Sequence, residues 1–307
     1  MSGARAHRLT ARCVVVFCLF DFVAALAAYA ADSAKAQLNK FTDKEFQHVQ
    51  VAARRGDAAA EAVLGVAYEE GIRVPKDMDE AIKWYRRAAA RDDAEVQHHL
   101  GLIYEDGSGV ARNFAEAAAW YSKAAVLGYS ASQNNLATMY LEGRGVARDP
   151  AQAAKWYEVA ARQGNAQAQS NIGYMYNYGV GVVQDDKQAV YWYRKAAEQG
   201  FAIAEKNLGV MYKLGRGVEA DEAQAIAWFE KAAAQGIARA WINEAILYMQ
   251  GKQITPDYKR AYELLQRATT AGEKDASPLL QQCRAHLNPG EPLMIESNAA
   301  AAHSSSR

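Results

Sequence analysis

Residues 136–164 read LATMYLEGRGVARDPAQAAKWYEVAARQG, and this stretch decides the fold of the 307-residue chain. Leu136 and Tyr140 are four residues apart, which places both on one face of a helix. Gly143 then ends that helix, because glycine adopts the positive φ of a helix C-terminus at little cost. Asp149 is a residue type that begins helices. The stretch therefore predicts two helices, here called helix A and helix B, joined by a glycine turn.

The same pattern recurs every 36 residues. A tryptophan occupies one position in five successive repeats: Trp84, Trp120, Trp156, Trp192 and Trp228. A tyrosine marks a second position in six repeats: Tyr68, Tyr104, Tyr140, Tyr176, Tyr212 and Tyr248. Six repeats without insertions thus cover residues 57–272, and a fixed period of this kind is the signature of a stacked-repeat fold. We expect each tryptophan and the aromatic residue after it to be buried between helices.

Helix B of every repeat is predicted to begin after an Asp or Asn: Asp77, Asn113, Asp149, Asp185, Asp221 and Asp257. The side chains of these residue types accept hydrogen bonds from the free backbone N–H groups of the first turn. Three residues later, five of the six repeats carry Glu or Gln. This spacing predicts the reciprocal hydrogen bonds of a capping box.

Single helices are expected at both ends of the array. Residues 41–56 align with a lone helix B, and residues 273–287 align with a lone helix A. We interpret both as caps that cover the exposed faces of the terminal repeats. Residues 31–40 form a polar linker, and residues 288–307 form a tail whose composition is typical of disorder.

Residues 1–30 have the order of a secretory signal peptide: three arginines, an apolar run, and small residues before the cleavage position. The run is short for a membrane span and contains Asp21. We therefore expect cleavage after Ala30, no membrane span afterwards, and a periplasmic or secreted protein of bacterial type. Cleavage after Ala36 and an uncleaved N-terminal anchor are the alternatives.

The charge balance argues against a nucleic-acid binder. The chain has 35 Lys and Arg against 35 Asp and Glu, whereas binding to nucleic acid calls for a basic excess. Removal of residues 1–30 would leave 32 basic and 34 acidic residues and a single cysteine, Cys283. We interpret Cys283 as a small buried residue; an intermolecular disulfide is the alternative.

At this point the residues point to a family. Residues 136–164 resemble the Sel-1-like repeat, and so does the fourth repeat with Gly179, Gly181, Trp192, Tyr193 and Gly200. The resemblance spans about residues 41–287. It implies an all-α fold, a right-handed α/α solenoid related to tetratricopeptide arrays, and an adaptor or scaffold that binds other proteins. The sixth repeat departs from the pattern at Glu244, Gln253, Leu264 and Thr269, so it is either looser or adapted to the C-terminal cap.

Catalytic motifs are not found. His98 and His99 are adjacent on a predicted helix, so they point about 100° apart and do not easily share one metal ion. No cofactor or metal is expected. Some secreted members of the family that the chain resembles are regarded as β-lactamases, but they carry a cysteine pair in each repeat, and this chain does not. A non-catalytic binder is thus the leading hypothesis, and a weak β-lactam or cell-wall hydrolase or a constitutive envelope scaffold are the alternatives.

By analogy with tetratricopeptide-like solenoids, the helix A faces are expected to line a concave groove. The first three repeats would supply its acidic end: Glu69, Glu70, Glu105, Asp106 and Glu142. Its middle would be aromatic and rich in amides: Asn134, Tyr174, Asn177 and Tyr178. The last three repeats would supply its basic end: Lys206, Lys213 and Arg239. Trp241 replaces the Glu or Gln of other repeats and is either a contact residue or packed against the cap. The pattern predicts a groove for a protein or peptide; a solvated surface with chance segregation of charge is the alternative.

Overall fold

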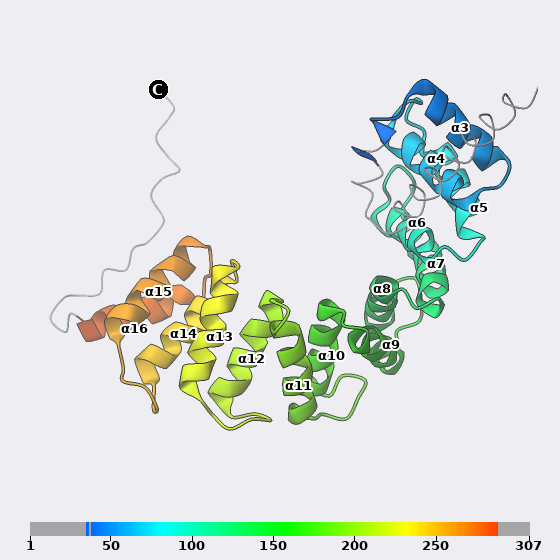
Figure 1. Cartoon of the computed structure of the whole chain (residues 1–307). Coiled ribbons are helices and arrows are strands. Elements are labelled where there is room, and N and C mark those ends of the chain that lie inside the picture. Colours follow the sequence, from blue (N-terminus) through cyan, green and yellow to red (C-terminus); the bar gives the residue numbers. More distant parts are fainter. Residues whose placement is uncertain (1–34, 37, 288–307) are drawn as a thin grey trace, which may run out of the picture. The chain divides into compact units, whose positions relative to one another are not determined.

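The structure is a computed structural model, and it describes residues 35–36 and 38–287. Every regular element in this part is an α-helix, and the chain divides into two compact units at Asn165 and Ala166 (Figure 1). The predicted signal peptide, half of the linker and the C-terminal tail lie outside the described residues. The repeated helix pairs confirm the all-α repeat fold that the sequence predicts.

The described part of unit 1 contains one single helix and three helix pairs: α3 (Asp43–Arg54), α4 (Ala58–Glu70), α5 (Met78–Ala89), α6 (Ala94–Asp106), α7 (Phe114–Val126), α8 (Ser130–Glu142) and α9 (Pro150–Arg162). Each helix packs against the next one along the chain. Helices A are α4, α6 and α8. Phe46, Val49 and Ala53 of α3 are buried in one cluster with α4, so α3 covers the first helix pair.

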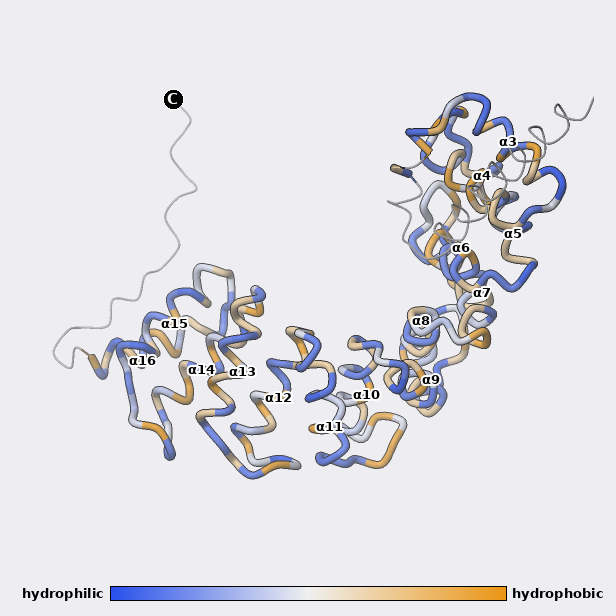
Figure 2. Tube along the Cα trace, viewed as in Figure 1, coloured by the Kyte–Doolittle hydropathy of each residue, from blue (hydrophilic) through white to orange (hydrophobic). Residues whose placement is uncertain are grey.

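Unit 2, as far as Leu287, contains three helix pairs and one single helix: α10 (Ala166–Tyr178), α11 (Asp186–Ala197), α12 (Ala202–Leu214), α13 (Glu222–Ala234), α14 (Ala238–Gln250), α15 (Tyr258–Thr270) and α16 (Ala276–Leu287). Consecutive helices again pack together, and most carry both hydrophobic and hydrophilic residues along their length (Figure 2). Helices A are α10, α12 and α14. Cys283 of α16 is buried against α15, and its thiol donates to the carbonyl oxygen of Tyr258 at 2.9 Å.

The turn between helix A and helix B is held by two hydrogen bonds that recur in all six repeats. The predicted Asp or Asn begins helix B in each, and its side chain accepts a backbone N–H of the first turn. Its own backbone N–H donates to the carbonyl of the repeated tyrosine of helix A, as Asp149 does to Tyr140 at 2.8 Å. That N–H is therefore already bonded, so the predicted capping box does not form in the repeats. In the described helices both halves of the box occur only between Thr42 and Glu45 of α3.

One packing contact recurs inside the helix pairs: the aromatic ring of helix B lies directly on a glycine of helix A. A Cβ atom added to Gly65 or Gly101 would lie 2.4 Å from the ring of Tyr85 or Tyr121. The pairs Gly173–Tyr193 and Gly209–Phe229 are arranged likewise, with distances of 2.9 and 2.6 Å. These rings are at most 2% exposed, which confirms that they are core residues.

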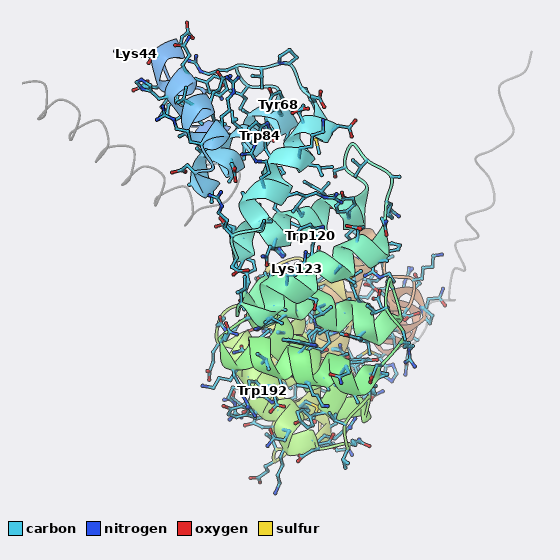
Figure 3. The ribbon with its side chains drawn as sticks, turned by 90° about the vertical axis from the view of Figure 1, so that its right-hand side faces the viewer. Lys44, Tyr68, Trp84, Trp120, Lys123 and Trp192 are labelled. Carbon is cyan, nitrogen blue, oxygen red and sulfur yellow. The ribbon has the colours of Figure 1, made fainter. Side chains whose placement is uncertain are left out.

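The tryptophan beside each ring is less buried than the sequence predicts. Trp120 and Trp192 are 9% and 6% exposed, whereas Trp84, Trp156 and Trp228 are only partly buried. The reason is their position: Trp120 of α7 packs on a cluster formed by α6 of its own repeat and α5, the helix B of the preceding repeat. Its outer face is covered by Lys123, whose Nζ lies 3.7 Å from the ring centroid (Figure 3). The tyrosine thus packs between the two helices of its own repeat, whereas the tryptophan also packs against the preceding repeat.

The sixth repeat has a different turn from the others, but this turn is held by specific hydrogen bonds. Gly251, at the end of α14, has φ −49° instead of the left-handed conformation found in the other helix A turns. Its turn is held from α13 by Glu222, whose carboxylate accepts the backbone N–H groups of Lys252, Gln253 and Ile254 at 2.8–3.1 Å. Burial raises the pKa of Glu222, but these hydrogen bonds outweigh it and hold the pKa below its usual value.

The glycine turn of α8 offers a test of inter-repeat contact. Gly145 has φ 70°, and a Cβ there would lie 2.0 Å from the carbonyl oxygen of Phe114; Gly164 has φ 92° and nothing within 4 Å of such a Cβ. Both alanine variants suffer left-handed strain of about 1–2 kcal/mol. We expect Gly145→Ala to lower the free energy of unfolding by about 1–3 kcal/mol more, because the backbones must also separate. Urea unfolding of both variants measures this; equal losses would contradict it.

The two kinds of tryptophan should differ in their contribution to stability. Trp120→Ala removes a buried ring and leaves a cavity, which costs about 3–5 kcal/mol. Trp156→Ala should cost roughly half as much, because less of its apolar surface leaves water on folding. Guanidinium unfolding followed by circular dichroism measures both. A larger loss for Trp156→Ala than for Trp120→Ala would contradict the packing described above.

Candidate functional site

The positions predicted to bind a partner form the surface of the A helices, which we call the A face. Its residue types change from repeat to repeat, although the core below is repeated. The position of Glu69 in α4 is taken in the next repeats by Glu105, Leu141, Asn177 and Lys213. Variation on a constant scaffold is what a surface that recognises a specific partner requires.

The buried tyrosines of the B helices reach the A face with their hydroxyl groups. Tyr85 donates to Glu69 at 2.6 Å, and Tyr121 donates to Glu105 at 2.7 Å. The hydroxyl of Tyr157 bonds to Thr138 at 2.7 Å, since Leu141 cannot accept a hydrogen bond. From the repeat pattern these tyrosines are expected only to be core residues. The 16-residue spacing between each Glu and its Tyr is the signal that would have revealed the pairs.

In unit 1 the acidic side chains are bound into networks. Glu69 accepts from Tyr85 and lies 2.8 Å from Nε2 of His99. Burial raises the pKa of Glu69, but the interactions with His99 and Tyr85 outweigh it, so its pKa lies below the usual value. His98 bonds separately to Ser132 at 2.9 Å, and burial lowers its pKa to about 4. Glu69 and the two histidines therefore hold the helices together.

The acidic part of the A face also has cationic partners that the sequence pattern does not predict. Arg144 follows α8 and lies within 3.3 Å of Glu105 and 2.5 Å of Glu142. Lys35 lies 2.5 Å from Glu70. Asp106 is exposed and its side chain forms no ion pair among the described residues. The negative charge that a partner can meet in unit 1 is thus smaller than the residue count suggests.

The two asparagines predicted to make the middle of the groove rich in amides lie mostly below the surface. Asn134 of α8 is 2% exposed, and Asn177 of α10 is 6% exposed. By contrast, Tyr174 and Tyr178 of α10 are 46% and 60% exposed, with ring centroids 4.6 Å apart. The aromatic surface predicted for this repeat therefore exists in unit 2, whereas the predicted amide-rich surface does not, because helix packing buries both asparagines.

The basic part of the A face in unit 2 consists of two half-buried lysines on α12. Lys206 and Lys213 form no ion pair with any described carboxylate, and Lys213 donates to Asn243 at 3.3 Å. Burial lowers the pKa of both, and Arg239 also lowers that of Lys206. Arg239 itself is already paired with Asp275 and Glu273, so its charge is compensated within unit 2.

Trp241 of α14 packs on core clusters of its unit. It is partly buried and packs on the cluster of α13 and α14 and on the cluster that includes α16. The polar residues at this position in other repeats are buried as well, for example Glu61 at 1% and Gln97 at 2%. These contacts favour the packing interpretation of Trp241.

The described residues offer no metal site and no membrane span. Within residues 35–36 and 38–287 no three His, Cys, Asp or Glu side chains are grouped so that they could hold a metal ion. No helix in this part of the chain is both long and apolar enough to cross a bilayer.

The helix pairs correspond to a known repeat family. The Sel1 repeat model matches six segments: residues 58–93, 94–129, 130–165, 166–201, 202–237 and 245–273. No curated protein matches the chain.

Two solved structures are similar over most of the chain. A Sel1 repeat protein from Oxalobacter formigenes is 32% identical with a TM-score of 0.67, covering 87% of this chain and 80% of its own. A protective antigen of uropathogenic Escherichia coli, which displays an SLR fold, is 29% identical with a TM-score of 0.74 over 87% of this chain. This chain spans 62% of that antigen's length. Since six matched repeats cover more than half of the chain, it belongs to the Sel1 repeat family.

Proposed function

We propose that the protein is an exported, non-catalytic repeat protein that binds protein or peptide partners through its A face, as an adaptor, scaffold or regulator. Sel1 repeat proteins are typically scaffolds for protein interactions, which supports binding as the general role. The observation that carries the proposal is the division of exposed charge. The A face of unit 1 presents Asp106, and the A face of unit 2 presents Lys206 and Lys213 without acidic partners.

The titratable groups of the A face support binding rather than catalysis. Glu69, Glu105 and His99 are engaged in hydrogen bonds or ion pairs that join neighbouring helices. A general acid or base must also lie within hydrogen-bond reach of a substrate atom. No observation on the described residues favours the β-lactam or cell-wall hydrolase.

Export is proposed from residues 1–30, whose basic, apolar and small-residue order is that of a signal peptide. We expect the protein isolated from its native host to begin at Ala31, because cleavage follows Ala30. A chain that begins at Gln37 would instead indicate the alternative cleavage after Ala36. Intact-mass analysis of the exported fraction distinguishes the two. A chain that still begins at residue 1 or 2 would contradict cleavage.

The A face of unit 1 can be tested by charge reversal at exposed positions. The partner is first captured by crosslinking in the native envelope, and its association rate with the purified chain is then measured. We expect Asp106→Lys to slow association severalfold, because electrostatic complementarity acts chiefly on the association rate. The effect should shrink as salt rises above 0.15 M, where the screening length is about 8 Å.

Glu263→Lys is the matched control, because Glu263 is an exposed acid on helix B of another repeat. It changes the net charge by the same amount without touching the A face. If Glu263→Lys slows association as much as Asp106→Lys does, the effect comes from the overall charge and the A face is not the binding surface.

A further inference from the structure

The fourth repeat breaks the rule that each buried tyrosine hydroxyl finds a partner. Tyr85, Tyr121 and Tyr157 are bonded to Glu69, Glu105 and Thr138. Tyr193 of α11 is 0% exposed, and its hydroxyl satisfies the geometry of a hydrogen bond with no described residue. A buried hydroxyl without a partner destabilises the fold, so such a group calls for an explanation.

A second unpaired group lies beside this hydroxyl. The side-chain oxygen of Asn177 is also buried without a hydrogen bond, and Asn177 is 6% exposed. The two residues are neighbours: burial raises the pKa of Tyr193, and the side-chain amides of Asn177 and Asn207, which lie within hydrogen-bonding reach of its oxygen as donors, oppose that rise. These amides leave the O–H of Tyr193 without an acceptor. One free O–H donor and one free oxygen acceptor thus lie together below the A face. This is the complement of a single peptide group, which has one acceptor and one donor.

Two exposed aromatic rings flank the unpaired groups. Tyr174 and Tyr178 belong to the same helix as Asn177, and both act electrostatically on Tyr193. Exposed rings change rotamer within picoseconds to nanoseconds, so they can move aside and then pack on a ligand. Tyrosine rings supply contact area at a low cost in entropy. Leu214 of α12 holds the position of Tyr178 in the next repeat and is 54% exposed, which extends the apolar surface.

The charge on the same two helices indicates which charge a ligand should carry. Lys206 precedes Asn207 on α12, and Lys213 follows two turns later, about 10 Å further along the helix. Neither lysine has a described acidic partner, whereas Arg216, which also faces Tyr178 and Tyr193, is paired with Asp186 at 2.6 Å. The uncompensated charge of this surface is therefore positive and belongs to the two lysines.

We propose that the A face of α10 and α12 is a subsite for an extended acidic peptide of a partner protein. One peptide group of the ligand accepts from the hydroxyl of Tyr193 and donates to Asn177, while its carboxylates meet Lys206 and Lys213. Tyr174 and Tyr178 pack against the apolar part of the same segment. This inference rests on the proposed function and adds the location and the chemistry of the ligand.

Selection of displayed random 12-residue peptides on the purified full chain tests the chemistry of the ligand. The enriched peptides should be rich in Asp and Glu and poor in Lys and Arg. A fluorescent copy of the best peptide should lose most of its affinity when its acids are replaced by Asn and Gln. Enrichment of neutral or basic peptides, or no enrichment, would overturn the proposal, as would equal competition by a single-stranded oligonucleotide.

The hydroxyl of Tyr193 is tested by a pair of matched variants. Tyr193→Phe removes an unpaired group, and Phe229 already holds this position in the fifth repeat. We expect Tyr193→Phe to leave the unfolding midpoint unchanged or raised, yet to weaken the peptide by about three- to tenfold. Tyr121→Phe, which breaks the bond to Glu105, should lower the midpoint and leave peptide affinity unchanged. A Tyr193→Phe protein that binds the peptide as wild type does would overturn the role of the hydroxyl.

The lysines are tested in the same assay. Reversal of both, Lys206→Glu with Lys213→Glu, should weaken the acidic peptide at least about tenfold, since attraction becomes repulsion. Lys187→Glu with Lys195→Glu is the control, because these lysines are exposed on helix B of unit 2. Equal losses in the two double variants would overturn the subsite.

The same assay separates this subsite from the broader proposal. If the selected peptides depend on Asp106 of unit 1 but not on Lys206, Lys213 or Tyr193, binding through an A face stands and the subsite is wrong. If they depend on neither set, the A face is not the binding surface and both proposals fail.

Discussion

The aromatic ring that lies on a glycine of the facing helix sets the geometry of four of the six repeats. At Gly65 and Gly101 a Cβ would lie 2.4 Å from the ring, so helix A and helix B approach as closely as backbone and ring permit. The turn between the two helices is short as well, and in every repeat the N–H of the residue that begins helix B donates to a carbonyl near the end of helix A. The same buried ring carries a hydroxyl from the core to the A face.

The residue type at one core position is therefore linked to the residue type at one position of the A face. Tyr85 and Tyr121 place a hydroxyl at the A face, and Glu69 and Glu105 accept from it there. In α12 the corresponding residue is Lys213, which can only donate, and the ring of that repeat is Phe229 without a hydroxyl. Buried hydroxyls need acceptors or donors, so the repeated scaffold limits which residues the surface can carry.

Much of the fold was predictable because it rests on local signals. The spacing of Trp120 and Trp156, the glycine turns and the Asp caps each act within one repeat, and the observed helices follow them. The candidate site was less predictable, since its chemistry depends on contacts between repeats. Glu105 pairs with Arg144 and Arg239 pairs with Asp275, over 39 and 36 residues, and residue counting cannot detect such compensation. Asn177 is buried because of the way the helices pack, and the order of residues along the chain does not indicate this.

Because the tyrosine extends from the core to the A face, it limits how the repeats of such an array can differ from one another. A copied repeat that changes the A-face residue beside its tyrosine hydroxyl needs another partner for that hydroxyl, as Thr138 provides for Tyr157 where Leu141 replaces the glutamate. The combination of Lys213 with Phe229 satisfies this constraint through two changes 16 residues apart. In the third and fifth repeats a changed surface residue is therefore accompanied by a second difference, Thr138 in one and Phe229 in the other.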